Sequence, residues 1–175
     1  MKRSIFNFQF SIFKREEGFT FIELLIFMGI FSILMLAMFQ LLIAIFDVQL
    51  ESQGTSAVSR DGRYILNRLT YDIKNATTVT NPGLGSQGQS LSLKEGVTTY
   101  TYELTNGNLT LTNSTTGTTD QLNSINTSVS NLNFLTLSDI STQNKTVTVS
   151  FTINSKVLRR EGINTESFNI TMGTR

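Results

Sequence analysis

The sequence predicts an α+β fold, in which one long N-terminal helix packs on a C-terminal antiparallel β-sheet domain. Two patterns along the 175 residues indicate this fold. Apolar residues dominate, or recur at helical spacing, up to residue 80, and after Gly85 apolar and polar residues alternate as in half-buried strands. The breakers from Asn81 to Gly85, which include the only proline, separate the two patterns.

The first part of the helix is expected to span a membrane. The apolar run from Leu24 to Phe46 is interrupted only by Gly29, Ser32 and Gln40. A spanning helix needs about 20 apolar residues, so residues 19–46 are assigned to it. A secretory signal peptide fits poorly, because its apolar core has about 7–15 residues and ends at a small-residue cleavage site.

Charge predicts the orientation and argues against some partners. Four basic residues and two acidic ones precede the apolar run: Lys2, Arg3, Lys14, Arg15, Glu16 and Glu17. This bias places the N-terminus in the cytoplasm and the C-terminal domain across the membrane. Ten basic and eleven acidic residues follow Gly18, so the exported part is close to neutral. Nucleic acid is not expected as a partner, because its binding surfaces normally carry a basic stripe.

Composition also argues against catalysis. The chain has no cysteine and no histidine, which excludes thiol nucleophiles, Ser–His relays and zinc sites built on these residues. Paired carboxylates remain formally possible, but the acidic residues after Leu50 are scattered singly. We therefore predict no enzyme, no catalytic residue, no metal ligand and no cofactor. The exported domain has no disulfides and must be held by its core and its partners.

Residues 47–80 are expected to continue the helix into water as an amphipathic segment. Its apolar residues recur at spacings near three and four: Val58, Ile65, Leu66, Leu69, Ile73 and Ala76. Its polar residues are left to the other faces: Arg60, Asp61, Arg63, Asn67, Arg68 and Lys74. Gly54, Gly62 and the pair Thr55–Ser56 weaken helix formation, so we expect a bend or frayed turn near Ser52–Ser56.

Residues 81–175 are expected to form the exported β-rich domain. Six segments are strand candidates: 90–93, 97–104, 109–111, 131–137, 147–153 and 168–172. Asn106–Gly107 indicates a tight hairpin, and the Thr/Asn/Ser-rich residues 112–130 are expected to form a long loop or irregular excursion. The amphipathic helix at 58–76 is the only cover available for the apolar face of the sheet.

One ionisable group stands at the edge of the apolar run. Glu23 lies where a charge is costly in a membrane, which makes it a candidate functional residue. It follows a string of distinctive residues: Lys14, Arg15, Glu16, Glu17, Gly18, Phe19, Thr20, Phe21 and Ile22. A plain signal anchor, with Glu23 merely marking the interface, is the simple alternative.

This string resembles the class III leader of type IV pilins and pseudopilins. The resemblance implies a cytoplasmic leader, residues 1–18, that prepilin peptidase cuts between Gly18 and Phe19 before it methylates the new amino group of Phe19. It assigns filament assembly to Glu23. The implied partners are that peptidase, other pilin or pseudopilin subunits bound through the N-terminal helix, and an inner-membrane assembly platform. The implied location is the bacterial inner membrane, and then the filament.

The positions of Gly18, Phe19 and Glu23 also have a physical explanation. A cut after Gly18 creates an amino group one helical turn from Glu23. In a low dielectric an ammonium and a carboxylate attract strongly, and each alone is costly. If Glu23 of one subunit meets the Phe19 amine of its neighbour, both charges are neutralised on stacking. Gly18 has no side chain, which gives a protease close access to the backbone.

The position within the family is less sharply marked. Major pilins typically carry a proline within the spanning helix, where this chain has Gln40, which favours a minor subunit. The remainder resembles J-type minor pseudopilins of type II secretion and W-type minor pilins, through residues 60–73, 131–134 and 171–175. The other functional class is a surface-exposed minor pilin for adhesion or DNA uptake. Arg159–Arg160 is the single basic pair of the exported part, which counts against DNA capture.

Overall fold

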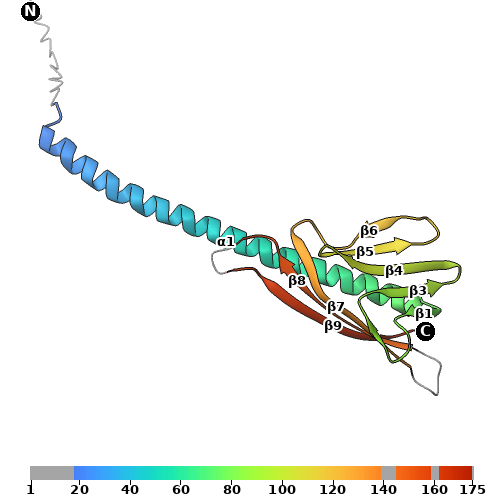
Figure 1. Cartoon of the computed structure of the whole chain (residues 1–175). Coiled ribbons are helices and arrows are strands. Elements are labelled where there is room, and N and C mark those ends of the chain that lie inside the picture. The colour runs from blue at the N-terminus through green and yellow to red at the C-terminus, as the bar shows by residue number, and fades with distance from the viewer. Residues whose placement is uncertain (1–17, 139–144, 159–161, 175) are drawn as a thin grey trace, which may run out of the picture. The chain divides into compact units, whose positions relative to one another are not determined.

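The computed structural model describes residues 18–138, 145–158 and 162–174. Its elements are one helix, α1 (Phe21–Asn75), followed by strands β1 to β9 (Figure 1). The chain divides into two compact units, residues 1–43 and 44–175, so the boundary falls within α1. The unit 44–175 contains the second part of the helix and all the strands, which confirms the predicted α+β fold.

The helix differs from the expectation in two places. It is continuous through Ser52–Ser56, so the frayed turn expected there as an alternative to a bend is wrong. Gly54 and Ala57 are buried in this part, where their small size aids packing. It ends at Asn75 and not near residue 80. The β-branched residues that follow form strand β1 (Thr78–Asn81), which pairs with β3 and withdraws the chain from the helix.

The first part of α1 meets the length and hydropathy expected of a membrane span. Among the described residues it is the one helix with a stretch long and apolar enough to cross a bilayer. The side chains of this stretch are all exposed in the structure. An exposed apolar surface of this size needs lipid or partner helices to cover it.

Two antiparallel sheets form the β-domain. The first has the order β1-β3-β4-β5-β6 and the second the order β2-β7-β8-β9. The first sheet adds to β1 the strands β3 (Leu91–Glu95), β4 (Thr98–Thr105), β5 (Asn108–Asn113) and β6 (Thr119–Gln121). The second consists of β2 (Gln87–Gly88), β7 (Thr127–Ser138), β8 (Lys145–Ser155) and β9 (Thr165–Gly173).

The strand predictions were largely confirmed, but β1, β2 and β6 were not among the predicted strands. Asn106 and Gly107 form the turn between β4 and β5, both with positive φ, as the hairpin signal predicted. Residues 112–130 are not one long loop, because β6 and the start of β7 lie within them. β6 contains no apolar residue, so its sequence gives no alternating pattern, and its pairing with β5 defines it instead.

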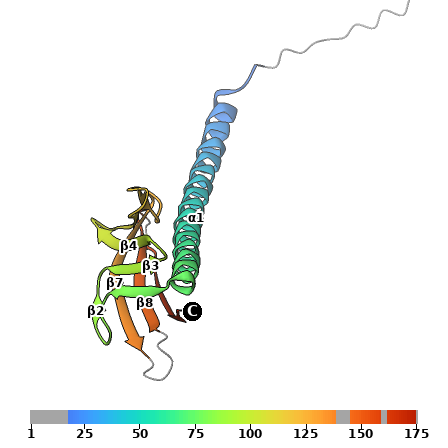
Figure 2. The ribbon, with the colours of Figure 1, turned by 90° about the vertical axis from the view of Figure 1, so that its right-hand side faces the viewer.

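The core joins the helix to both sheets. Figure 2 shows the C-terminal part of α1 lying along the strands. The predicted apolar face is buried, and Leu66 packs at its edge. From α1 and the two sheets the core includes Val58, Ile65, Leu69, Ile73, Leu91, Leu93, Tyr102, Leu109, Phe134, Val147, Val149, Phe151 and Ile153. The amphipathic segment is therefore the cover of the sheets, as predicted.

Candidate functional site

The predicted site lies at the start of α1. Gly18, Phe19 and Thr20 precede the helix, and Glu23 stands in its first turn. The Thr20 carbonyl accepts the first helical hydrogen bond, from the Leu24 amide at 3.1 Å. The Thr20 hydroxyl accepts a second one from the Glu23 amide at 3.4 Å. Thr20 is thus the N-cap of the helix.

This cap was overlooked in the sequence although its signal is present. A threonine followed three residues later by a glutamate is the spacing of a capping box. Glu23 therefore has a local structural role besides the predicted one, because a carboxylate in the first turn interacts favourably with the helix dipole. The capping also fixes where the helix begins, two residues after Phe19.

The structure brings the sequence-predicted residues together. Gly18, Phe19, Thr20 and Glu23 line one open hollow, and all four are exposed. The Glu23 carboxylate has no hydrogen-bond or ion-pair partner within the described part of the chain. The remaining leader residues, including the basic pair Lys14–Arg15, lie outside the described residues, as does Arg159–Arg160. In the described part of the site, residues 18–20 thus lead into the capped helix α1, and the Glu23 carboxylate is exposed in its first turn.

Two buried aspartates were not predicted. Asp61 was placed on a polar face of the helix, but it is buried. Its Oδ2 accepts hydrogen bonds from the Ser124 amide at 2.8 Å and the Thr127 hydroxyl at 2.6 Å. Burial raises the pKa of Asp61, but the hydrogen bonds from Ser124 and Thr127, together with the charge of Arg60, outweigh it and lower that pKa. This carboxylate ties the helix to the loop before β7.

The second aspartate ties the helix to β4. Asp72 Oδ2 accepts hydrogen bonds from the Tyr102 hydroxyl and from Arg68 Nε, the latter at 3.0 Å. Burial, followed by the negative charge of Asp72, raises the pKa of the Tyr102 hydroxyl. The Arg68 guanidinium also lies over the Tyr100 ring, 6.0 Å from its centroid. Asp72 and Tyr102 are buried in this cluster, so it serves the packing of the helix on β4.

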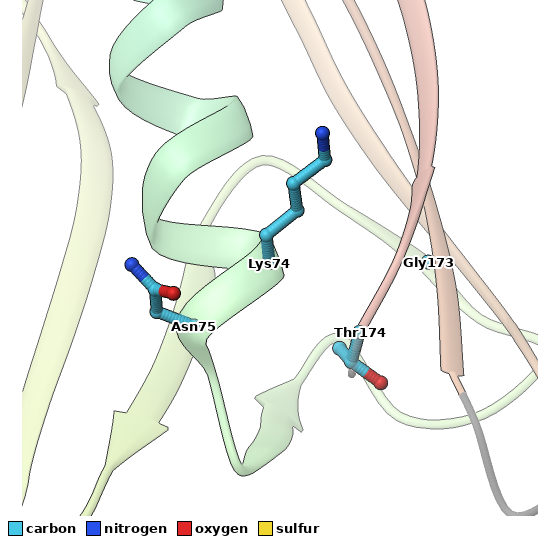
Figure 3. Close-up of a pocket in the computed structure, with 4 residues that line it drawn as sticks. All are labelled: Lys74, Asn75, Gly173 and Thr174. Atoms are coloured by element: carbon cyan, nitrogen blue, oxygen red, sulfur yellow. The ribbon is translucent and has the colours of Figure 1, made fainter.

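A second hollow lies in the unit 44–175, where α1 and β9 end. Lys74 and Asn75 at the end of α1 line it together with Gly173 and Thr174 at the end of β9 (Figure 3). These four residues contribute one ammonium group and no acid, so they provide no acid–base pair. Among the described residues there is also no group of three or more acidic side chains that could hold a metal ion.

One comparison with known proteins finds a match, and it covers the N-terminal segment. The family model described as the prokaryotic N-terminal methylation motif matches residues 13–39. No curated protein and no solved structure matches the chain. The matched segment contains the capped helix start and most of the apolar run.

Motif and fold together define a membrane-anchored protein with an N-terminal methylation motif and a helix-covered β-domain. The match over residues 13–39 supports the type IV pilin and pseudopilin family. The motif supports a pilin-type protein processed by prepilin peptidase and implies assembly with other pilin subunits.

Proposed function

We propose that this protein is a minor pilin or pseudopilin, a non-catalytic structural subunit of a type IV pilus-like or type II secretion filament. One observation carries the proposal: Glu23 lies in the first turn of a capped helix, exposed beside Phe19, at the head of an apolar run. The absence of proline from that run supports a minor position. The J-type pseudopilins and W-type minor pilins are the members proposed as most similar.

The proposed processing starts from the membrane-inserted precursor with its N-terminus in the cytoplasm. Prepilin peptidase cuts between Gly18 and Phe19 and methylates the Phe19 nitrogen. The amide cut here precedes the helix by two residues and is not part of the α1 hydrogen-bond ladder. Its exposed, non-helical backbone supports access by a protease, since no helical turn has to be opened first.

The proposed assembly step pairs charges between subunits. The Phe19 ammonium of one subunit meets the Glu23 carboxylate of the next on an inner-membrane platform. At an apolar boundary two separate charges are each poorly solvated, and their approach removes much of that penalty. Methylation leaves the nitrogen basic, so the positive charge that this pairing needs is retained.

Replacement of the glutamate tests this function. With Glu23→Val, we expect normal leader cleavage but little recovery of the subunit in sheared or co-purified filaments. Asp47→Asn, on the same helix beyond the apolar run, is the matched control and should assemble normally. Mass spectrometry of the membrane form should show N-methylated Phe19. Normal incorporation of Glu23→Val, or a leader still attached in assembled subunits, would contradict the proposal.

A further inference from the structure

Strand β9 (Thr165–Gly173) is the last strand of the second sheet and pairs only with β8 (Figure 1). At one end of the pairing the Thr174 amide donates to the Lys145 carbonyl at 2.8 Å. At the other end the Ser155 amide donates to the Asn164 carbonyl at 2.8 Å. Bonded pairs alternate along an antiparallel ladder, and the register of this one is continuous. The backbone groups that point away from β8 therefore belong to the odd-numbered residues of β9: Thr165, Ser167, Asn169, Thr171 and Gly173.

These outward backbone groups form an open edge that is already ordered. All the odd-numbered residues of β9 are exposed, and their outward groups have no backbone partner within the described part of the chain. The even-numbered side chains rest on α1, where the Ser59 hydroxyl donates to the Glu166 carboxylate at 3.0 Å and Phe168 lies against Gly62. Since β8 and α1 hold the strand in place, a further strand could pair with it at little entropic cost.

The β9 edge lacks the features that normally protect an edge strand. Short length, a bulge, lysine or proline usually prevent pairing with another chain. Among the described strands, β2 has two residues, β6 has three, and β1 has a register shift between Val79 and Asn81. Strand β9 has nine residues, a continuous register and no proline, lysine or arginine. Its one charged residue, Glu166, is bonded on the helix side. This edge is therefore the one suited to strand addition.

The side chains of the outward-facing residues favour an uncharged partner. They lie on the face of the sheet that points away from α1, and all except Gly173 carry a hydroxyl or amide group. Thr171 shares a hydrogen bond with Thr148 of β8 at 2.9 Å. Ser167 does the same with Thr152 at 3.1 Å. A neighbouring strand meets no charge from β9 on this face, so uncharged polar side chains suit it best.

The opposite face of β9 favours apolar side chains. Phe168 and Ile170 are partly buried there and pack at the edge of the core. Apolar residues opposite them would cover the surface that remains exposed. Strand β8 already pairs with β9 in this pattern, with Phe151 opposite Phe168. The strand that fits the open edge therefore alternates apolar with uncharged polar residues, as β8 does.

We propose that the outer edge of β9 binds an antiparallel strand of another protein, in which apolar residues on the helix side alternate with uncharged polar residues. Backbone hydrogen bonds to the odd-numbered residues supply the affinity, and the contacts with Phe168 and Ile170 supply the selectivity. The bound strand extends the second sheet beyond β9. The proposal concerns the unit 44–175 and does not depend on the charge pairing proposed for Glu23.

A peptide with the sequence of residues 146–154 tests the edge, because β8 has the required alternation. Titration of the fluorescently labelled peptide with the full-length protein in detergent should give saturable anisotropy. Asn169→Pro removes an outward amide and no bond to β8, so it should weaken binding about tenfold. Thr119→Pro is the matched control, because the bond from the Asn113 amide to the Thr118 carbonyl leaves the Thr119 amide on the outer edge of β6. It should bind the peptide as the wild type does.

Methylated peptides identify the edge that is used and leave the protein unchanged. Antiparallel pairing on the open edge turns the amides of peptide positions 148 and 150 toward β9. N-methylation there should abolish binding, whereas N-methylation at positions 149 and 151 should be tolerated. A peptide that displaces β8 would need both sets of amides, so loss of binding with both would overturn the proposal.

Two other results would also overturn it. One is the absence of saturable binding, or equal binding by Asn169→Pro and the wild type. The other concerns a second copy of this chain, whose β9 would pair about Asn169. The chain has no cysteine of its own, so rapid disulfide dimerisation of Asn169→Cys, with loss of peptide binding in the dimer, would assign the edge to a second copy and not to another protein.

Discussion

Gly62 is expected to be essential for the packing of β9 on the helix. A methyl group at this position would lie 2.1 Å from Cζ of Phe168 and 2.5 and 2.6 Å from its two Cε atoms. Carbon atoms prefer separations of about 3.5–4.0 Å, so the ring tip would have to withdraw by about 1.5 Å. Behind it the ring stacks on the buried Phe151, with centroids 5.3 Å apart.

Opposing effects determine how Gly62→Ala changes the free energy of unfolding. Alanine within a helix is more favourable than glycine by about 1 kcal/mol. Overpacking costs about 1–3 kcal/mol, and loss of the aromatic stacking adds about 0.5–1.5 kcal/mol. We expect a net destabilisation of about 1–2 kcal/mol, seen as a fall of several degrees in Tm when the full-length protein unfolds in detergent, followed by circular dichroism.

The same substitution in a Phe168→Ala variant tests the steric explanation. When Phe168 is first replaced by alanine, the same Gly62→Ala change should become stabilising by about 1 kcal/mol, because only the helix propensity remains. Gly173→Ala is the control, since a methyl group there meets no atom within 4 Å, and it should not lower Tm. An increase in Tm for Gly62→Ala with Phe168 intact, or the same sign in both backgrounds, would refute the steric explanation.

The buried aspartates give two further predictions. Because the pKa of Asp61 is lowered in the folded state, its stabilisation is full above its ordinary value of 3.8 and is lost as the pH falls through the folded value. Asp61→Asn should therefore lower Tm at neutral pH. When the pH is lowered, the Tm of this variant should fall less than that of the wild type. An equal fall of Tm in both proteins would contradict this explanation. Tyr102→Phe leaves Asp72 buried with one donor fewer and should cost about 1–3 kcal/mol in denaturant unfolding. Tyr100→Phe keeps the ring that lies beside Arg68 and should cost less, whereas equal costs would show that the Tyr102 hydroxyl contributes little.

The sequence alone predicted those features of the fold whose signal lies in neighbouring residues. The spacing of Ile65, Leu69 and Ile73 predicted the buried face of α1, and Asn106–Gly107 predicted a hairpin, because both signals depend on neighbours within a turn or two. The motif around Gly18 is equally local, and the matching family model covers it. The alternation of period two predicted β3, β4, β5, β8 and β9 as strands, with small differences at their ends.

The missed features depend on partners far along the chain. Asp61 is polar at a position that a helical pattern leaves to solvent, and its burial requires Thr127, 66 residues later. Gly62 appeared to be a weakness of the helix because nothing local shows that Phe168 lies against it. Similarly, β6 becomes a strand through its pairing with β5, which its own polar sequence does not indicate.

The unbroken path of α1 into the domain core has a mechanical consequence. A pull along the helix axis acts on the same element that contributes Val58, Ile65, Leu69 and Ile73 to the core shared with both sheets. Such a pull loads these contacts together, because they lie on one face of a single helix. We therefore expect the domain to resist extraction of its helix through the burial of this face.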